Sequence, residues 1–326
     1  MAEPTEPVSI NARADGCSIL IIAPDYDLAA TLDSGQAFRW QRDGPGWTGI
    51  VDRRWVRLEQ RGTQLFAIAA HPGRDWSWLT NYLQTSVSLA PVLAAFPDDP
   101  PMRAAVGACR GLRLLRQDPW ECLASFLLSS TKQISQIRQI VARLCERFGE
   151  PVAAPAGQPR AFAFPSAQTL AEAGVEDLRD CKMGFRAPNL RAAAKAVARG
   201  ELNLKRIGEL DLKEARTQLM KLPGVGPKIA DCVLLFAYEF PAAFPVDVWV
   251  LRALRELYFA GHQPRLRELR EFAATHFGQY AGWAQQYLFH YMRMHRGRPN
   301  TGRESLPIRA PKLPSPSLPM PEAAVA

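Results

Sequence analysis

Two polar residues that stand 19 positions apart, Lys228 and Asp247, could do chemistry on a substrate. A lysine is a nucleophile only as the neutral amine, which at an ordinary pKa near 10.4 is about one part in 2,500 at pH 7. Burial, nearby positive charge and the positive end of a helix lower such a pKa, and a lowering of about three units costs roughly 4 kcal/mol. Lys228 is the first cation of an apolar helical run, so it is either an activated nucleophile or a phosphate contact.

Asp247 directly precedes a second helical run, over residues 248–258. Aspartate is a preferred N-cap, and this structural role alone would explain the residue. A carboxylate held ionised at a helix start could also stabilise positive charge that develops on a sugar. Cys232 lies one helical turn after Lys228 on the same face, so a thiolate there would pair with the ammonium group and titrate with it.

The connection before Lys228 reads Leu-Pro-Gly-Val-Gly-Pro over residues 222–227 and joins two helical runs, 212–220 and 229–238. The backbone N–H groups around Gly224, Val225 and Gly226, together with the positive end of the second helix, suit a phosphate. The proline at position 227 fits the first turn of that helix, where its missing N–H costs nothing. The pattern predicts a DNA-binding hairpin over residues 212–238, and the alternative is an ordinary corner between two helices.

This hairpin, the lysine, and the Pro-Val-Asp at 245–247 resemble the helix-hairpin-helix-Gly/Pro-Asp signature of DNA base-excision glycosylases. More of the chain is similar to the eukaryotic-type 8-oxoguanine DNA glycosylase family. The matching motifs run in the family's order over about residues 15–295. They are Ser-Gly-Gln-Ala-Phe-Arg-Trp at 34–40, Arg-Gln-Asp-Pro at 116–119, Gly-Phe-Arg-Ala at 184–187 and Tyr-Ala-Gly-Trp-Ala-Gln at 280–285.

The resemblance implies a bifunctional DNA N-glycosylase and AP lyase of base-excision repair. Such an enzyme flips 8-oxoguanine out of duplex DNA, preferably from opposite cytosine, and excises it. Lys228 would attack the sugar C1′, Asp247 would stabilise the oxocarbenium-like charge, and the resulting Schiff base would permit β-elimination. No organic cofactor or metal site is expected, although backbone carbonyls of the hairpin could hold a monovalent cation.

Four residues match the family's base pocket. Gly35 would offer its backbone carbonyl to the hydrogen on N7 of 8-oxoguanine, a position where guanine has only a repelling lone pair. Gln285 would read the Watson–Crick edge of the purine, because an amide both donates and accepts. Phe289 would stack on one ring face and Cys232 would pack on the other. The simpler roles are a turn for Gly35 and ordinary helix packing for Phe289.

Phe185 and Arg186 match residues that contact DNA at the lesion. An exposed aromatic suits a wedge that fills the gap left by a flipped base, and an adjacent arginine suits the acceptors of the orphaned cytosine. The alternative is that Phe185 belongs to the core and Arg186 is solvated.

The chain departs from the family pattern at several DNA-binding positions. The stretch Ser-Ser-Thr-Lys-Gln at 129–133, which contains Thr131 and Lys132, stands where the family has consecutive asparagines. Gln136 stands where the family has an arginine, and both of the replaced groups read the opposite cytosine. We therefore expect weaker discrimination for cytosine. Trp249 stands where the family often has histidine, which changes the local phosphate and pocket contacts.

Composition supports a DNA partner and the absence of a metal cluster. The 326 residues carry a net charge of +8 and a pI of about 9.4, which suits a polyanion. The six cysteines form no Cys-x-x-Cys pair and none follows position 232, which argues against zinc, against an iron–sulfur cluster and for a reducing compartment. No membrane span or cleavable signal is apparent, so we expect a monomer in the cytoplasm of a bacterium or the nucleus of a eukaryote.

The elements that must position these residues predict an α+β fold. Residues 1–14 are expected to be disordered and 15–100 to form an N-terminal domain, with strands at 17–22, 38–42, 47–51, 55–60 and 64–69 in an antiparallel meander. Residues 101–296 are expected to form a helical two-part glycosylase core with helices at 120–128, 134–148 and 190–199. Residues 151–159 read as a Pro/Ala/Gly loop, and 297–326 as a disordered Pro-rich tail.

Two alternative functions remain from the residues themselves. One is a glycosylase of the same superfamily that acts on another damaged purine, such as an alkylated base, although monofunctional members usually lack the lysine. The other is a non-catalytic DNA-binding module in which Lys228 contacts phosphate and Asp247 caps a helix. The placement of these two side chains discriminates, because catalysis requires them on the same side of the core.

Overall fold

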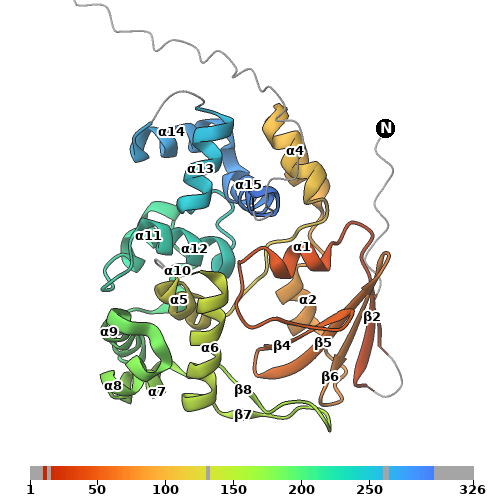
Figure 1. The fold of residues 1–326 in the computed structure, drawn as a ribbon, viewed down its shortest axis with the longest axis vertical. Coiled ribbons are helices and arrows are strands. Elements are labelled where there is room, and N and C mark those ends of the chain that lie inside the picture. Colours follow the sequence, from red (N-terminus) through yellow and green to blue (C-terminus); the bar gives the residue numbers. More distant parts are fainter. Residues whose placement is uncertain (1–9, 13–15, 130–132, 260–263, 297–326) are drawn as a thin grey trace, which may run out of the picture.

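The computed structural model describes residues 10–12, 16–129, 133–259 and 264–296 of the chain. Its N-terminal part is an antiparallel sheet with the strand order β1-β2-β6-β5-β4-β3 (Figure 1). The strands are β1 Ile10–Ala12, β2 Ser18–Ile22, β3 Gln41–Asp43, β4 Gly46–Val51, β5 Arg54–Arg61 and β6 Gln64–Ala69. Strands β3 to β6 follow one another as a meander, and mostly helical structure follows the sheet, so the expected α+β architecture is confirmed.

One face of the sheet is buried by helices. Alternate residues along β5 and β6, among them Leu58 and Leu65, are buried, as the two-residue period of a strand requires. They pack with buried residues of α1 (Leu28–Asp33) and α2 (Ser77–Leu83) in one apolar cluster. This cluster fixes α1, whose end leads directly into residues 34–36 of the candidate site.

Three local expectations were wrong. The expected strand at 38–42 begins only at Gln41, because the rings of Phe38 and Trp40 are buried between elements: Phe38 packs on Phe126 at 5.4 Å between ring centroids. Residues 10–12, expected in a disordered segment, form β1, whose backbone pairs with β2. The stretch expected as a loop at 151–159 contributes β7 (Pro151–Val152), which pairs with β8 (Ala161–Phe162).

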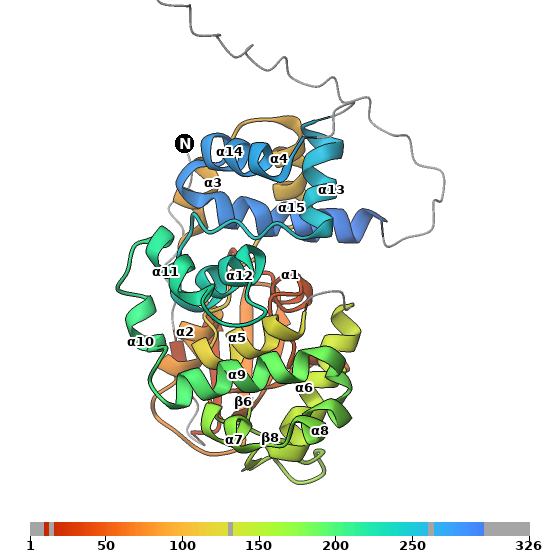
Figure 2. The ribbon, with the colours of Figure 1, turned by 90° about the vertical axis from the view of Figure 1, so that its left-hand side faces the viewer.

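The helical part forms two groups with α12 between them (Figure 2). One group contains α3 Leu89–Ala94, α4 Pro100–Ala108, α13 Val248–Leu257, α14 Leu266–His276 and α15 Ala281–Arg296. The other contains α5 Pro119–Leu128, α6 Ile134–Phe148, α7 Ala167–Glu172, α8 Val175–Leu178 and α9 Ala187–Ala198. A π-helical turn, Arg179–Met183, and a 3-10 turn, Gly184–Arg186, connect α8 to α9, and a further 3-10 turn, Gly278–Tyr280, precedes α15.

Helix α12 (Pro227–Tyr238) is the central element of the helical part. Nine of its 12 residues, from Ile229 to Ala237, are buried, and Phe236 stacks on Phe126 of α5 with ring centroids 5.6 Å apart. Helices α10 (Leu204–Ile207) and α11 (Leu212–Leu219) precede it, so α11 and α12 form the expected helix pair. The N-terminus of α12 therefore has a rigid position where the two groups of helices meet. None of the helices in the described ranges is long and apolar enough to cross a membrane.

Candidate active site

A cavity of ≈ 1140 Å³ lies where α5, α12 and α15 meet the start of α6, the start of α13 and the segment after α1. It brings together residues that the sequence analysis selected from four separate motifs. The predicted residues that line it are Gly35, Lys228, Cys232, Asp247, Trp249, Gln285 and Phe289. Gly224, Val225 and Gly226 of the hairpin, the 185–186 pair and Gln136 are not among the residues that line it.

Lys228 is the second residue of α12, and its amine faces this cavity. Its Nζ donates a hydrogen bond of 2.8 Å to the hydroxyl of Ser129, which follows the last residue of α5. The ammonium group also lies 5.6 Å from the ring centroid of Phe126, within the range of a cation–π contact. Two groups from α5 thus hold the amine, and the side chain is only half-buried, so a substrate can reach it.

Asp247 caps the start of α13 and also lines the cavity. Its Oδ1 accepts hydrogen bonds from the backbone N–H of Trp249 at 2.9 Å and of Val250 at 2.8 Å, so the expected N-cap is confirmed. Both bonds use the same oxygen, which leaves Oδ2 outside the cap. Burial raises the pKa of Asp247, and the Val250 N–H bond and the positive charge of Lys228 oppose that rise. The two side chains line one cavity and interact electrostatically, as joint catalysis requires.

Cys232 lies one turn beyond Lys228 and is fully buried. Burial raises the pKa of the Cys232 thiol to about 12, and the nearby charge of Lys228 opposes this only in part. The thiol is therefore neutral at pH 7, and the expected thiolate–ammonium pair is wrong. Cys232 instead contributes a small, polarisable wall to the cavity.

Gly35 occupies a position that requires glycine. It follows the C-cap of α1 with φ at +78°, and a Cβ built there would lie 2.5 Å from Cδ1 of Ile134. The side chain of its buried neighbour Gln36 fixes this segment: Nε2 donates to the carbonyl of Arg113 at 2.8 Å, and Oε1 accepts from the backbone N–H of Leu115 at 2.7 Å. The backbone of Gly35 is thus held against the cavity with little freedom.

Gln285 and Phe289 lie one turn apart on α15 and both face the cavity. The Oε1 atom of Gln285 is buried and has no hydrogen-bond partner among the described residues. An unpaired buried acceptor costs roughly 1–3 kcal/mol, so this oxygen is suited to accept a hydrogen bond from a group in the cavity, whether water or a ligand. Phe289 is largely buried and presents its ring beside Gly35, with Cε1 3.4 Å from the Cβ position built there.

The hairpin presents backbone donors at the start of α12. Gly224 is exposed with φ at +82°, and Gly226 is the N-cap residue of α12. In the described part of the chain, the N–H groups of both glycines make no backbone hydrogen bond, whereas the N–H of buried Val225 donates to Leu222 O at 3.1 Å. The free donors and the helix N-terminus together suit an anion on the surface.

The exposure of Phe185 and Arg186 is opposite to the alternative in which Phe185 belongs to the core and Arg186 is solvated. Phe185 is 72% exposed, whereas Arg186 is buried at 4% exposure. The guanidinium carbon of Arg186 lies 4.4 Å from the centroid of the Phe185 ring, so the buried arginine packs against the exposed aromatic ring. An apolar ring this exposed contributes little to the core, and the reading of Phe185 as a core residue is wrong.

Of the residues at which the chain departs from the family pattern, the structure describes Gln136 and Trp249. Gln136 is exposed, and its Oε1 accepts from the backbone N–H of Gln133 at 3.0 Å, which caps the start of α6. Trp249 is half-buried and lines the cavity. Thr131 and Lys132 lie outside the described residues.

Among the polar residues that line the cavity, sequence reasoning did not select Ser129 and Arg293 for the site. Ser129 stood in a stretch selected for its DNA-binding positions, but only the fold brings its hydroxyl to the lysine. Arg293 lines the cavity one turn after Phe289, with its guanidinium carbon 5.4 Å from that ring's centroid. The spacing of four residues on α15 was the available signal for Arg293.

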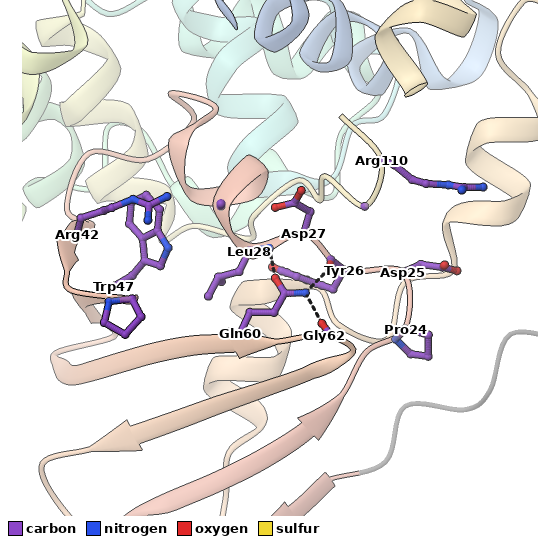
Figure 3. Close-up of a pocket in the computed structure, with 13 residues that line it drawn as sticks. Pro24, Asp25, Tyr26, Asp27, Leu28, Arg42, Trp47, Gln60, Gly62 and Arg110 are labelled. Carbon is purple, nitrogen blue, oxygen red and sulfur yellow. Dashed lines mark hydrogen bonds between the residues drawn. The ribbon is translucent and has the colours of Figure 1, made fainter. Parts of the chain in front are cut away.

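A second cavity, of ≈ 690 Å³, lies beside the sheet and contains none of the predicted site residues (Figure 3). Gln60 lines this cavity, and its side-chain amide makes hydrogen bonds there. Its Oε1 accepts from the backbone N–H of Leu28 at 2.7 Å, and its Nε2 donates to the carbonyl of Tyr26 at 2.6 Å. Because the amide is already engaged on both sides, we interpret Gln60 as a structural joint between α1 and β5.

Comparison with known proteins gives a consistent assignment for both halves of the chain. The 8-oxoguanine DNA glycosylase N-terminal domain matches residues 18–123, and the HhH-GPD superfamily of base excision DNA repair proteins matches residues 124–277. The N-glycosylase/DNA lyase OGG1 of Arabidopsis thaliana is 33% identical over 285 residues, which cover 81% of this chain and 77% of the relative.

Two solved structures are similar over most of the chain. The 8-oxoguanine glycosylase/lyase of Clostridium acetobutylicum, in complex with double-stranded DNA containing cytosine opposite 8-oxoG, has a TM-score of 0.82 at 31% identity and covers 88% of this chain and 98% of its own. MBOgg1, in complex with a low-affinity DNA ligand, has a TM-score of 0.83 at 31% identity, with coverages of 89% and 99%.

Proposed function

Because the chain belongs to the OGG1-type 8-oxoguanine DNA glycosylases, with their N-terminal and HhH-GPD domains, we propose that it excises 8-oxoguanine from duplex DNA and then cleaves the abasic strand. The observation that carries the proposal is the convergence of Lys228 and Asp247 on one cavity, which is also lined by Gly35, Gln285 and Phe289. The enzyme would act as a monomer. The division of the chain near residue 100, into a sheet domain and a glycosylase core, is part of the proposal.

In the first step, the ammonium group of Lys228 gives up a proton, and the lone pair freed on Nζ forms a bond to C1′ of the flipped nucleotide while the bond from C1′ to the base breaks. The base leaves with the bonding electrons and takes up a proton. Positive charge develops on the sugar in this step, and the carboxylate of Asp247 stabilises it. The cap bonds hold Asp247 in place, so little reorganisation is needed as the charge appears.

In the second step, loss of a proton from the nitrogen and opening of the sugar ring give a Schiff base between Lys228 and C1′. The Schiff base acidifies C2′. Removal of a proton there expels the 3′ phosphate, which cuts the strand by β-elimination. The lysine is thus the group on which both activities depend.

Recognition of the base would use the other residues of the cavity. The carbonyl of Gly35 would accept from N7–H of the lesion, and the unpartnered Oε1 of Gln285 would accept from an N–H group of the Watson–Crick edge. Phe289 would stack on one face of the purine, and the neutral thiol of Cys232 would pack on the other. Guanine, which lacks N7–H, would face the Gly35 carbonyl with a lone pair and be rejected.

The DNA contacts would surround this cavity. The amides near Gly224, Val225 and Gly226 would bind a phosphate, with a monovalent cation held by hairpin carbonyls as an additional element. Phe185, whose ring is exposed, would fill the gap in the duplex. Arg186 would contact the orphaned base, and because its side chain is buried beside Phe185 in the free protein, this contact requires the side chain to turn outward when DNA binds.

The positions that depart from the family pattern would complete the interface. Thr131, Lys132, Gln136 and Trp249 would contribute to binding around the cavity. Because Gln136 replaces an arginine and engages its own helix start, we expect a preference for cytosine that is present but weak.

Borohydride trapping on an 8-oxoguanine:cytosine duplex tests the proposal. We expect a covalent complex with the wild type and with Lys221→Gln, an exposed lysine of the same hairpin, but not with Lys228→Gln. Trapping that survives in Lys228→Gln would place the nucleophile elsewhere. Base release without trapping would indicate a monofunctional enzyme, and a lesion preference for alkylated purines would indicate the related glycosylase activity. Duplex binding without either reaction would indicate the binding module.

A further inference from the structure

We propose that Arg293 of α15 donates a hydrogen bond to the C8 carbonyl of the flipped purine, so that the pocket reads the oxidised carbon directly as well as N7–H. This inference rests on the proposed function. It concerns a specificity residue, and it starts from the fact that Gly35, Phe289 and Arg293 meet at one corner of the cavity.

The position of the guanidinium is fixed by three contacts. A Cβ built on Gly35 would lie 3.1 Å from Nη1 of Arg293. The guanidinium carbon lies 5.4 Å from the centroid of the Phe289 ring, and Nη1 donates to the carbonyl of Asp33 at 3.2 Å. Because Asp33 is the last residue of α1, its carbonyl is at the helix end that prefers a cation.

Most of the donors of Arg293 remain available. A guanidinium carries five N–H groups, and the bond to the Asp33 carbonyl is the one hydrogen bond of Arg293 among the described residues. No salt bridge within 4.0 Å joins Arg293 to a carboxylate of the described residues, and the Asp33 carboxylate lies 3.8 Å from Arg138. Arg293 is half-buried and lines the cavity, so its unused N–H groups can reach a bound base.

The spacing along α15 assigns these donors to the C8 end of the purine. Gln285, Phe289 and Arg293 are successive at four-residue intervals and line the same cavity, and the first and last lie about 12 Å apart along the helix axis. Gln285 is assigned to the Watson–Crick edge and Phe289 to the ring face. Arg293 therefore lies toward the opposite, imidazole end, which carries C8.

Arg293 and Asp247 line the same cavity, which is consistent with a place for Arg293 on the sugar side of the pocket. The charges of Asp247 and Arg293 influence each other, and Asp247 is the residue assigned to the sugar. In a purine, C8 is bonded to N9, the atom that carries the sugar, whereas the C6 carbonyl lies on the far side of N7. A base whose N7–H meets the Gly35 carbonyl thus turns its C8 oxygen toward Arg293.

The contact would discriminate because guanine has only a C–H group at C8. A hydrogen bond from a charged donor is worth about ten- to a hundredfold in affinity, and guanine would receive none of it. The N7–H contact with Gly35 and the C8 contact with Arg293 would report the same oxidation from adjacent ring atoms.

The test is the preference of the full-length protein for two non-cleavable duplexes. One carries 2′-fluoro-8-oxodeoxyguanosine and the other 2′-fluorodeoxyguanosine, each opposite cytosine. We expect Arg293→Met to reduce the ratio of the two affinities at least tenfold, and Arg293→Lys, which keeps the charge and some donors, to restore part of it. Arg267→Met removes an exposed arginine of α14 and should leave the ratio unchanged.

Two results would overturn the inference. If Arg293→Met weakens both duplexes equally, the arginine binds phosphate or supports the fold; if it changes neither, it makes no contact. Should Arg293→Met fail to fold, Arg293→Lys replaces it in the test. An Arg293→Lys variant that binds both duplexes about tenfold more weakly, with an unchanged ratio of the two affinities, would likewise mean that the arginine binds phosphate or supports the fold. A wild type that excises 8-oxoguanine while Arg293→Met keeps its preference rejects only this inference. A wild type that shows no excision rejects the proposed function as well.

Discussion

The amine of Lys228 donates a hydrogen bond of 2.8 Å to the hydroxyl of Ser129, a residue 99 positions earlier in the chain. The hydroxyl of Ser129 in turn donates to the carbonyl of Phe126 at 2.7 Å. Because its single proton is used in that bond, the serine presents lone pairs to the amine. The end of α5 thereby fixes the position of the group that starts α12, and Ser129 is a positioning residue for Lys228.

We expect Ser129→Ala to slow base excision about tenfold, because the amine loses a hydrogen bond that holds it in line with the sugar. Single-turnover excision of 8-oxoguanine measures this. Borohydride trapping should persist and duplex affinity should be unchanged, which separates a positioning effect from misfolding. Ser135→Ala, at an exposed serine that lines the same cavity, is the matched control. Equal rates for both variants would contradict the assignment.

Asp247→Asn separates the cap from the chemistry. Asparagine caps a helix about as well as aspartate, so we expect the free energy of unfolding to stay within about 1 kcal/mol of the wild type. Excision should fall at least about a hundredfold, because the amide cannot stabilise positive charge on the sugar. Asp247→Ala should lose both the cap and the activity. Urea melts and excision assays on the two variants measure this, and an active Asp247→Asn would leave the cap as the only role.

Phe185→Ala should leave stability unchanged within about 0.5 kcal/mol, because its ring is 72% exposed and little apolar area is lost from the core. Excision from duplex DNA should slow at least about tenfold, because nothing then fills the space of the flipped base. Leu266→Ala, at another exposed apolar side chain, on α14, is the control and should affect neither quantity. A large loss of stability in Phe185→Ala would argue that the residue is structural.

Gly35→Ala should destabilise the protein by about 2 kcal/mol and abolish base excision. The φ of +78° strains any other residue by roughly 1–2 kcal/mol, and the new methyl group would meet Ile134 at 2.5 Å. Gly62 has a φ of +57° and open space around its Cβ position. Gly62→Ala should therefore show the cost of the backbone strain without that of a steric contact. Unfolding and excision measured on both variants separate the two terms, and an active Gly35→Ala would remove Gly35 from the base pocket.

Hydrophobic periodicity and capping residues predicted those helices whose bounds depend on local sequence. The helix at 134–148 has the predicted bounds because its apolar residues recur at three- and four-residue spacing and face one core. The cap by Asp247 and the early proline of α12 followed from backbone chemistry at helix starts. The strand at 38–42 failed because burial of Phe38 and Trp40 comes from packing between elements, which an apolar run does not distinguish from a strand.

The site was less predictable because its polar contacts join distant segments. The bond between Lys228 and Ser129 depends on the placement of α5 against α12. The order of burial at Phe185 and Arg186 depends on how the turn before α9 meets its neighbours, and two adjacent residues give no local signal for it. The neutral thiol of Cys232 likewise follows from complete burial, which its helical position alone did not reveal.

His290 makes the stability of the protein depend on pH. It lies next to Phe289 on α15, is 6% exposed, and its Nδ1 has no partner among the described residues. Burial, and then the positive charge of Arg293, lower the pKa of His290 to about 4, from an ordinary value near 6.5. The native protein therefore binds fewer protons at this residue than the unfolded chain between pH 6.5 and 4.

Where the unfolded state binds more protons, stability falls as the pH falls. For the pKa values of about 6.5 and 4, we expect His290 alone to remove about 2 kcal/mol of stability between pH 7.5 and pH 5. Urea melts at the two pH values measure this, with His290→Leu as the variant and His295→Leu, at an exposed histidine of the same helix, as the control. His290→Leu should lose about 2 kcal/mol less than the wild type over this range. Parallel losses in the wild type and His290→Leu would mean that the native protein binds a proton at His290 as readily as the unfolded chain does.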